Sequence, residues 1–252
     1  MNRLCFFAGA VGLTVSAASA ASGLPDLIEA ASPSVVVVGT YDALKTPRFT
    51  FRGTGFVVAG GDRVVTNAHV LPKAGDPDAE DKVAVLVPRE GAAPDVRWIR
   101  RQLVDAVHDL AVMTIDGAPL PALRLSAGEV ARAGTSVALI GFPLGATLGL
   151  VPATHRGIIS AVTAIALPPP TARQLDERTL SRLRQGVFDI LQLDATAYPG
   201  NSGSPLLDLE SGQVVGIINM VYVKSTKESA VGQPTGITYA IPVRHLVDLL
   251  KQ

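Results

Sequence analysis

The stretch that decides the fold is Tyr198-Pro-Gly-Asn-Ser-Gly-Ser-Pro-Leu206, in which a serine lies between glycines in a tight turn. Apolar segments flank it at Ile190–Leu193 and Val214–Ile218. Glycines allow backbone conformations closed to other residues and let a ligand approach closely. Such a turn can direct consecutive N–H groups to one point beside an exposed hydroxyl, as an acyl-transfer nucleophile requires. Taken alone, the segment is equally compatible with a glycine-rich hairpin.

Two fragments upstream supply the partners that a serine nucleophile needs. Thr66-Asn-Ala-His-Val70 places His69 at the end of a strand, and Asp109 precedes the apolar run Leu110–Met113. Alone, the histidine could be a surface or packing residue and the aspartate a structural one. Together they form a set, because a histidine takes the serine proton near pH 7 and an aspartate orients the imidazole. The chain order His69, Asp109, Ser202 is that of the chymotrypsin type.

Length and composition predict a folded chain of one large or two modest domains. The chain has 252 residues, of which 48% are hydrophobic, enough to bury a sizeable core. Its 22 basic and 22 acidic residues give a formal net charge of +0. Because nucleic acids and anionic membranes attract concentrated positive charge, we expect neither as a partner.

The first twenty residues have the pattern of a secretory signal peptide. Arg3 is their only charge, Leu4–Val15 is apolar, and we expect cleavage after Ala20. A membrane anchor is the alternative, but this apolar run is too short to span a bilayer. We therefore expect removal of residues 1–20, no membrane span afterwards, and a periplasmic or secreted location.

The mature chain is expected to contain no cysteine, because Cys5 is the only one. This excludes a cysteine nucleophile, disulfides and a thiolate metal site. The histidines also have no metal-ligand spacing; they are His69, His108, His155 and His245. We expect His108 and Asp109 to point to opposite faces of a strand, and we expect no metal or cofactor.

The remaining pattern predicts an all-β protein of short strands with a helix near each end. The first strands are expected at Val35–Val38, Gly55–Val58, Val64–Thr66, Val83–Val87, Arg97–Val104 and Leu110–Ile115. The second series is expected at Ser136–Gly141, Thr154–Val162, Ile190–Leu193, Val214–Val221 and Thr238–Ile241. The expected helices are Leu24–Ala31 and Val243–Lys251. Strands at this spacing without intervening helices favour barrels or sandwiches.

Two segments interrupt the strands. Residues from Asp116 to about Ala133 are expected to cross between two domains, 21–120 and 121–252. Pro168–Gly186 begins with three prolines and continues as a charged helical stretch, Thr171–Gln185, which we interpret as a solvated surface excursion.

Several motifs occur in the order found in one known family. They are Arg52-Gly-Thr-Gly-Phe-Val-Val58, Val65-Thr-Asn-Ala-His-Val70, Asp109-Leu-Ala-Val-Met113, Ala138-Leu-Ile-Gly-Phe-Pro-Leu-Gly145, Gly157-Ile-Ile-Ser-Ala161, Asp194–Leu206 and Tyr239-Ala-Ile-Pro-Val243. In this set the chain resembles the chymotrypsin-fold serine proteases, specifically the bacterial HtrA/Deg type. The resemblance implies two six-stranded antiparallel β-barrels with short N- and C-terminal helices and a site between the barrels.

The resemblance also implies a role for each site residue. His69 would be the general base, Asp109 its orienting partner and Ser202 the nucleophile of a serine endopeptidase. The N–H groups of Gly200 and Ser202 would form the oxyanion hole, with Asn201 shaping the turn between them. Asn201 cannot form the activating ion pair with a new N-terminus that an aspartate forms in animal trypsins.

A substrate site is implied near Thr196, Ala197 and Tyr198 and along Ile218, Asn219 and Met220. Neither Thr196–Tyr198 nor Gly216–Val221 contains an acidic residue that could pair with a substrate lysine or arginine. The sequence therefore favours a small or apolar residue before the scissile bond. The strand is expected to pair with an extended protein or peptide substrate.

Two departures from the family pattern keep alternatives open. The usual Gly-Asn-Ser-Gly-Gly-Pro has Ser204 in place of its last glycine, which raises the alternative of an inactive, chaperone-like or peptide-binding homologue. The usual PDZ domains are not expected here, and a homo-oligomer is left open. An esterase is disfavoured because the chain lacks the Gly-x-Ser-x-Gly elbow and βαβ alternation.

Overall fold

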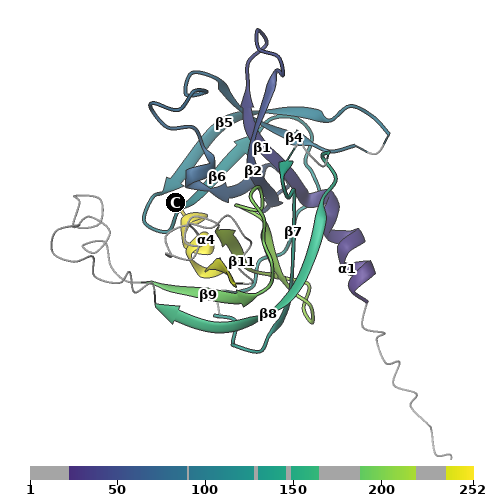
Figure 1. The fold of residues 1–252 in the computed structure, drawn as a ribbon, viewed down its shortest axis with the longest axis vertical. Helices are drawn as coiled ribbons and strands as arrows, with labels where there is room; N and C mark the ends of the chain where they lie inside the picture. Colours follow the sequence, from purple (N-terminus) through teal and green to yellow (C-terminus); the bar gives the residue numbers. More distant parts are fainter. Residues whose placement is uncertain (1–22, 90, 128–129, 146–148, 165–187, 220–236) are drawn as a thin grey trace, which may run out of the picture.

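Two closed, six-stranded antiparallel barrels form the body of the computed structural model, one above the other in Figure 1. The structure describes residues 23–89, 91–127, 130–145, 149–164, 188–219 and 237–252. The predicted all-β class, with two barrels and short terminal helices, is confirmed. The predicted signal peptide 1–20, the excursion Pro168–Gly186 and residues 220–221 lie outside the described residues.

The first barrel has the strand order β1-β2-β3-β6-β5-β4. Its strands are β1 (Val35–Tyr41), β2 (Phe49–Val58), β3 (Arg63–Asn67), β4 (Lys82–Val87), β5 (Asp95–Asp105) and β6 (Leu110–Ile115). The four valines at the start of β1 are buried on both faces, because Val35 and Val37 pack into a core shared by both barrels while Val36 and Val38 pack within the first. Burial on both faces explains an unbroken apolar run in place of alternation.

The second barrel has the strand order β10-β11-β12-β9-β8-β7. Its strands are β7 (Ser136–Gly141), β8 (Ala153–Ala164), β9 (Asp189–Asp194), β10 (Pro205–Asp208), β11 (Val214–Asn219) and β12 (Ile237–Pro242). Residues 116–135 connect β6 to β7, and Leu125 forms an isolated bridge with Val214 on the way.

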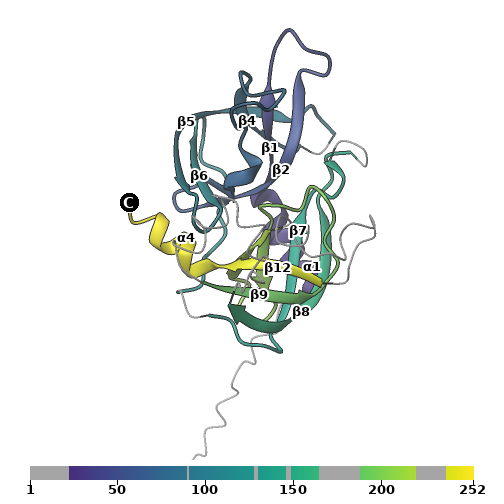
Figure 2. The same ribbon diagram turned by 60° about the vertical axis from the view of Figure 1, so that its left-hand side comes forward.

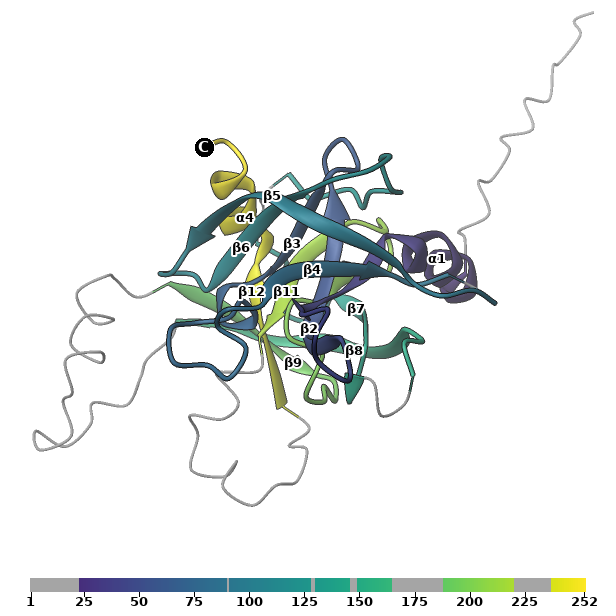
Figure 3. The same cartoon turned by 90° about the horizontal axis from the view of Figure 1, so that it is seen from above.

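Short helices lie at the two ends of the described chain, on opposite sides of the molecule (Figure 3). The first helix, α1 (Leu24–Ala31), has its bounds as predicted and leads through the 3₁₀ turn η1 (Ser32–Ser34) into β1. The last, α4 (Val243–Leu249), continues β12 and lies beside the first barrel (Figure 2). No helix in the described ranges is long and apolar enough to cross a membrane.

The structure corrects three details of the sequence-based prediction. Strand β2 begins at Phe49, six residues before the predicted Gly55. Pro205–Asp208 is a strand, although no strand was predicted there and Pro205 and Leu206 were assigned to the turn that contains Ser202. Four residues are too few to show a period, and this strand forms through its long-range neighbours, since Leu206 pairs with both Leu139 and Gly216.

The third correction concerns His108 and Asp109. Both lie in a turn between β5 and β6, and not on opposite faces of a strand. Asp109 has a φ of 54°, in the left-handed region that a strand residue does not adopt. The apolar run after Asp109 gives no sign of this turn.

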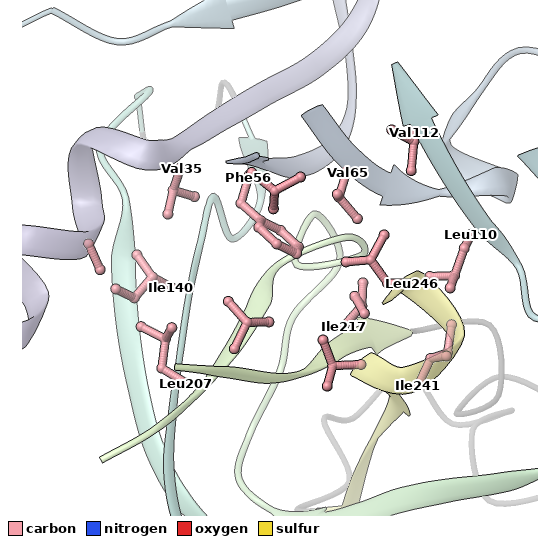
Figure 4. Close-up of a cluster of buried hydrophobic side chains, with 14 of the residues drawn as sticks. Val35, Phe56, Val65, Leu110, Val112, Ile140, Leu207, Ile217, Ile241 and Leu246 are labelled. Carbon is pink, nitrogen blue, oxygen red and sulfur yellow. The ribbon is translucent and has the colours of Figure 1, made fainter. Parts of the chain in front are cut away.

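One hydrophobic cluster joins the two barrels. Figure 4 shows Leu246 of α4 among Val65 and Leu110 of the first barrel and Ile217 and Ile241 of the second. All of these residues are fully buried. Helix α4 therefore fixes the barrels against each other through side chains that neither barrel could bury alone.

We expect Leu246→Ala to lower the free energy of unfolding by about 2–5 kcal/mol, because it leaves a cavity in this shared core. The matched control is Leu44→Ala, the same substitution at a side chain that is 95% exposed, with an expected change within about 0.5 kcal/mol. Urea unfolding of both variants tests this, and equal losses would contradict the role given to α4.

Candidate active site

The turn that carries Ser202 depends on two glycines in the left-handed region. Gly200 has a φ of 103° and Gly203 a φ of 86°. A Cβ on Gly200 would lie 2.4 Å from the Phe142 carbonyl oxygen, and one on Gly203 would lie 2.1 Å from the Thr54 carbonyl oxygen. Both the backbone conformation and the close packing therefore require glycine at these positions.

Thr54 of β2 attaches this turn to the first barrel. Its N–H donates to the Ser202 carbonyl at 2.9 Å, and its hydroxyl donates to the Gly200 carbonyl at 2.7 Å. The same hydroxyl accepts from the N–H of Phe142 at 3.0 Å. Thr54 stands in one of the sequence motifs, but no local pattern predicts these contacts, because they join segments far apart in the chain.

His69 and Asp109 are held together by their backbones as well as by their side chains. His69 lies in the 3₁₀ turn η2 (Ala68–Val70), directly after β3. Its N–H donates to Asp109 Oδ1 at 2.9 Å. The Asp109 carbonyl accepts from the Ala68 N–H and from the Asn67 side-chain amide, both at 3.1 Å. These contacts explain how Asp109 keeps its left-handed backbone conformation.

The three predicted residues meet in one line of hydrogen bonds. His69 Nδ1 lies 2.6 Å from Asp109 Oδ2, and His69 Nε2 lies 2.9 Å from Ser202 Oγ. The imidazole and the carboxylate are both about four-fifths buried, so the pair is shielded but reachable from solvent. The arrangement places a proton acceptor beside the serine hydroxyl and a carboxylate behind that acceptor.

Asn219 contributes a further contact that sequence reasoning did not foresee. Its side-chain amide donates to Asp109 Oδ2 at 2.7 Å, although the sequence placed Asn219 only in a substrate site. Asn219 is fully buried at the end of β11, so the second barrel supplies a hydrogen bond to the carboxylate of the first.

Ser204 and Asn201 lie behind the turn, where both are fully buried. A Cβ on Gly141 would lie 2.1 Å from Ser204 Oγ and 2.8 Å from Asn201 Oδ1. Within the described part of the chain, neither the Ser204 hydroxyl nor the Asn201 amide has a hydrogen-bond partner. Ser204 thus fills the space beside Gly141, at the end of β7.

The residues expected to form a substrate site are only partly brought together. Thr196, Ala197 and Tyr198 follow β9 and lead into the Ser202 turn, and the Tyr198 ring lies 5.6 Å from that of His155. Burial lowers the pKa of His155, which favours its neutral form.

Ile218 is placed differently from the prediction. Its side chain is in the core of the second barrel, its carbonyl accepts from Gly203 N–H, and its own N–H donates to the Ser204 carbonyl. The backbone of Ile218 therefore supports the Ser202 turn, and its side chain is fully buried. Met220 lies outside the described residues.

The arrangement contains no candidate metal centre in the ranges that the structure describes, where no three His, Asp or Glu side chains cluster suitably. The site brings together a serine hydroxyl, an imidazole and a carboxylate.

Comparison with known proteins assigns this fold to a class. Over 90% of this chain the fold matches a solved structure of the HtrA-type protease AlgW with a decapeptide, with a TM-score of 0.63, 24% identity and 66% of that chain covered. At this identity the likeness shows the fold, a pair of chymotrypsin-like barrels.

Residues 53–217 match the trypsin-like peptidase domain, and the chain belongs to this family. It is 32% identical over 202 residues to a probable periplasmic serine endoprotease DegP-like of Halomonas elongata, covering 79% of this chain and 34% of that protein. It is 31% identical over 227 residues to serine protease HTRA1A of Danio rerio, covering 87% of this chain and 39% of that protein. The chain spans little more than a third of these relatives' length.

We expect Gly141→Ala to destabilise the fold by about 1–3 kcal/mol, because the new methyl group would overlap the Ser204 hydroxyl. The double variant Gly141→Ala/Ser204→Gly should recover part of that loss, since it removes the overlapping oxygen. Thermal unfolding of the single and double variants measures this. Strictly additive losses would show that the two residues do not share the space described.

Proposed function

We propose that the chain is an exported serine endopeptidase that hydrolyses peptide bonds of unfolded or extended proteins through an acyl-enzyme. One observation carries the proposal: the line of hydrogen bonds from Asp109 Oδ2 through the His69 imidazole to Ser202 Oγ, at 2.6 and 2.9 Å. A nucleophile, a base and an orienting carboxylate at these distances are the elements of a serine hydrolase triad.

In the proposed reaction, His69 Nε2 removes the Ser202 hydroxyl proton while Oγ attacks the substrate carbonyl carbon. The imidazolium then gives this proton to the leaving amine, which leaves the acyl group on Oγ. A water molecule attacks the ester in the same way, with His69 again as base, and releases the acid. The Asp109 carboxylate accepts from Nδ1–H throughout and stabilises the imidazolium.

The orientation of two peptide groups supports an oxyanion hole at Gly200 and Ser202. The Pro199 carbonyl accepts from Leu144 N–H at 2.7 Å, and the Asn201 carbonyl accepts from Ser204 N–H at 3.0 Å. In a trans peptide the N–H points away from the carbonyl, so these bonds fix the direction of both donors before a substrate arrives. As far as the described chain shows, the N–H groups of Gly200 and Ser202 have no other acceptor. Fixed donors of this kind are each worth about 3 kcal/mol in the transition state.

The proposed substrate class and location rest on the sequence of the predicted pocket, on residues 1–20 and on the relatives. An unfolded segment can enter a site between two barrels as an extended chain, and the predicted pocket contains no acidic residue to select lysine or arginine. The signal-like residues 1–20 and the names of the periplasmic relatives support action in the periplasm or outside the cell.

We expect Ser202→Ala to lower kcat for unfolded casein on the order of 10⁶-fold, as loss of a triad serine does. Labelling by a fluorophosphonate should vanish in the same variant, because the reagent requires an activated hydroxyl. Thermal unfolding serves as the control and should change little. A wild type that neither labels nor cleaves, yet suppresses aggregation of casein, would instead support the binding-module alternative.

Cleavage of peptides that differ only before the scissile bond tests the proposed pocket. We expect kcat/KM to be at least about tenfold higher for valine or alanine than for arginine, because a buried cation without a partner is costly. The variant Thr196→Asp should raise cleavage after arginine, because it supplies an anion beside Ala197. A wild-type preference for arginine would contradict the proposed specificity.

A further inference from the structure

Two histidines that the proposed reaction does not use are stacked where the barrels meet. The ring centroids of His108 and His245 lie 3.9 Å apart, with 20° between their planes. His108 precedes Asp109 in the turn of the first barrel, and His245 lies on α4, which continues the second. The ring of Phe188 meets both edge-on, at 4.7 Å from His108 and 5.4 Å from His245.

His108 is tied to the turn that holds Asp109. Asp105 Oδ1 accepts from the N–H groups of Val107 and His108, at 3.0 and 3.1 Å. Asp105 Oδ2 lies 2.6 Å from His108 Nδ1, so the ring and the backbone of this turn form one unit. The pKa of Asp105 is lowered: burial opposes the shift, but the hydrogen bonds from His108 outweigh it, which keeps the carboxylate ionised. A displacement of the His108 ring would therefore displace the residue that follows it.

His245, the other ring of the stack, is held by Arg244. Its Nε2 accepts from Arg244 Nε at 3.3 Å, and Arg244 also forms an ion pair with Asp189 of β9 at 3.3 Å. A ring nitrogen that accepts a hydrogen bond carries no proton, so this contact selects the neutral imidazole.

We propose that His108 and His245 are a positioning pair: their stacked rings fix the Asp109 turn of the first barrel against α4 of the second. The Asp109 turn then has two links to the second barrel: the stack at His108 and the Asn219 amide at Asp109 Oδ2. The inference rests on the proposed function, because it assigns the pair to the geometry of that site. The pair does not touch the reacting atoms and acts through Asp109.

The charges around the stack make the pair sensitive to acid. Asp105 faces His108 from the same turn, and His108, Arg244, Asp105 and Asp248 are the charged or titratable groups near His245 in the described chain. Burial, then His108 and Arg244, lower the pKa of His245 to about 4, against the opposite influence of the two aspartates. The neighbouring positive groups and the burial therefore favour the neutral form of His245.

The direction of the pH effect follows from linkage. Between the ordinary histidine pKa of 6.5 and about 4, the unfolded chain binds a proton at this residue that the folded chain does not. The stability that neutral His245 contributes is therefore complete above pH 6.5 and is lost as the pH falls toward 4.

Three variants of the full chain test the pair at pH 8, where His245 is neutral. His245→Ala removes the ring and should lower kcat on the order of tenfold with KM unchanged, because a small displacement of an orienting group slows the chemical step. His245→Phe keeps a stacking ring and should restore kcat to within about twofold of wild type. Val247→Ala, a half-buried position on the same helix, is the matched control and should leave kcat unchanged.

A second readout uses the midpoint of thermal unfolding between pH 7 and pH 5. The wild type should lose several degrees more over this interval than His245→Phe, which has no proton to gain. Equal kcat losses in His245→Ala and Val247→Ala, or failure of His245→Phe to restore kcat, would overturn the proposal. If the wild type neither labels with a fluorophosphonate nor cleaves casein, the proposed function fails. The unfolding midpoints then still test the stack, and an equal change of midpoint with pH in the wild type and His245→Phe would refute it.

Discussion

The hydrogen bonds of Thr54 are the interaction on which the rest of the site depends. Its backbone and hydroxyl join the first barrel to the Ser202 and Gly200 carbonyls of the second, and its carbonyl accepts from the Thr66 hydroxyl at 2.7 Å. The carbonyl also packs so closely on Gly203 that no side chain fits there. The Ser202 turn is therefore shaped by a strand of the opposite barrel, and its geometry depends on contact between the two barrels.

The same constraint explains why the site lies where the barrels meet. His69 and Asp109 come from the first barrel and Ser202 and Asn219 from the second, so each hydrogen bond across the junction needs a fixed relation between the two. The shared hydrophobic core and α4 hold the two barrels in contact. Hydrophobic attraction is non-directional, so it does not by itself set their relative orientation. The directional contacts of Thr54, of Asn219 and of the stacked histidines set that orientation.

The sequence identified the three residues that meet at the candidate site better than it identified their surroundings. The triad candidates stand in short motifs whose order and residue types are informative. The apolar runs left barrels and sandwiches open, and it was the resemblance to a known family that implied the two six-stranded barrels. Strand β10 was not predicted, because four residues are too few to show a periodic pattern. The turn at Asp109 was not predicted, because an apolar run begins directly after it. Ile218 was predicted to pair with a substrate, but its backbone is already hydrogen-bonded to Gly203 and Ser204.

By itself, the sequence determined most of the strands, the two helices and the set of chemical groups that a serine hydrolase needs. These properties are local, because they depend on apolar runs, on glycines and on residue type within a few positions. Only the tertiary structure decided which groups meet: His69 and Ser202 are 133 positions apart, Asp109 and Asn219 110, and Thr54 and Gly200 146. Contacts at such separations arise when two barrels close and pack, and no local pattern encodes their distance or direction.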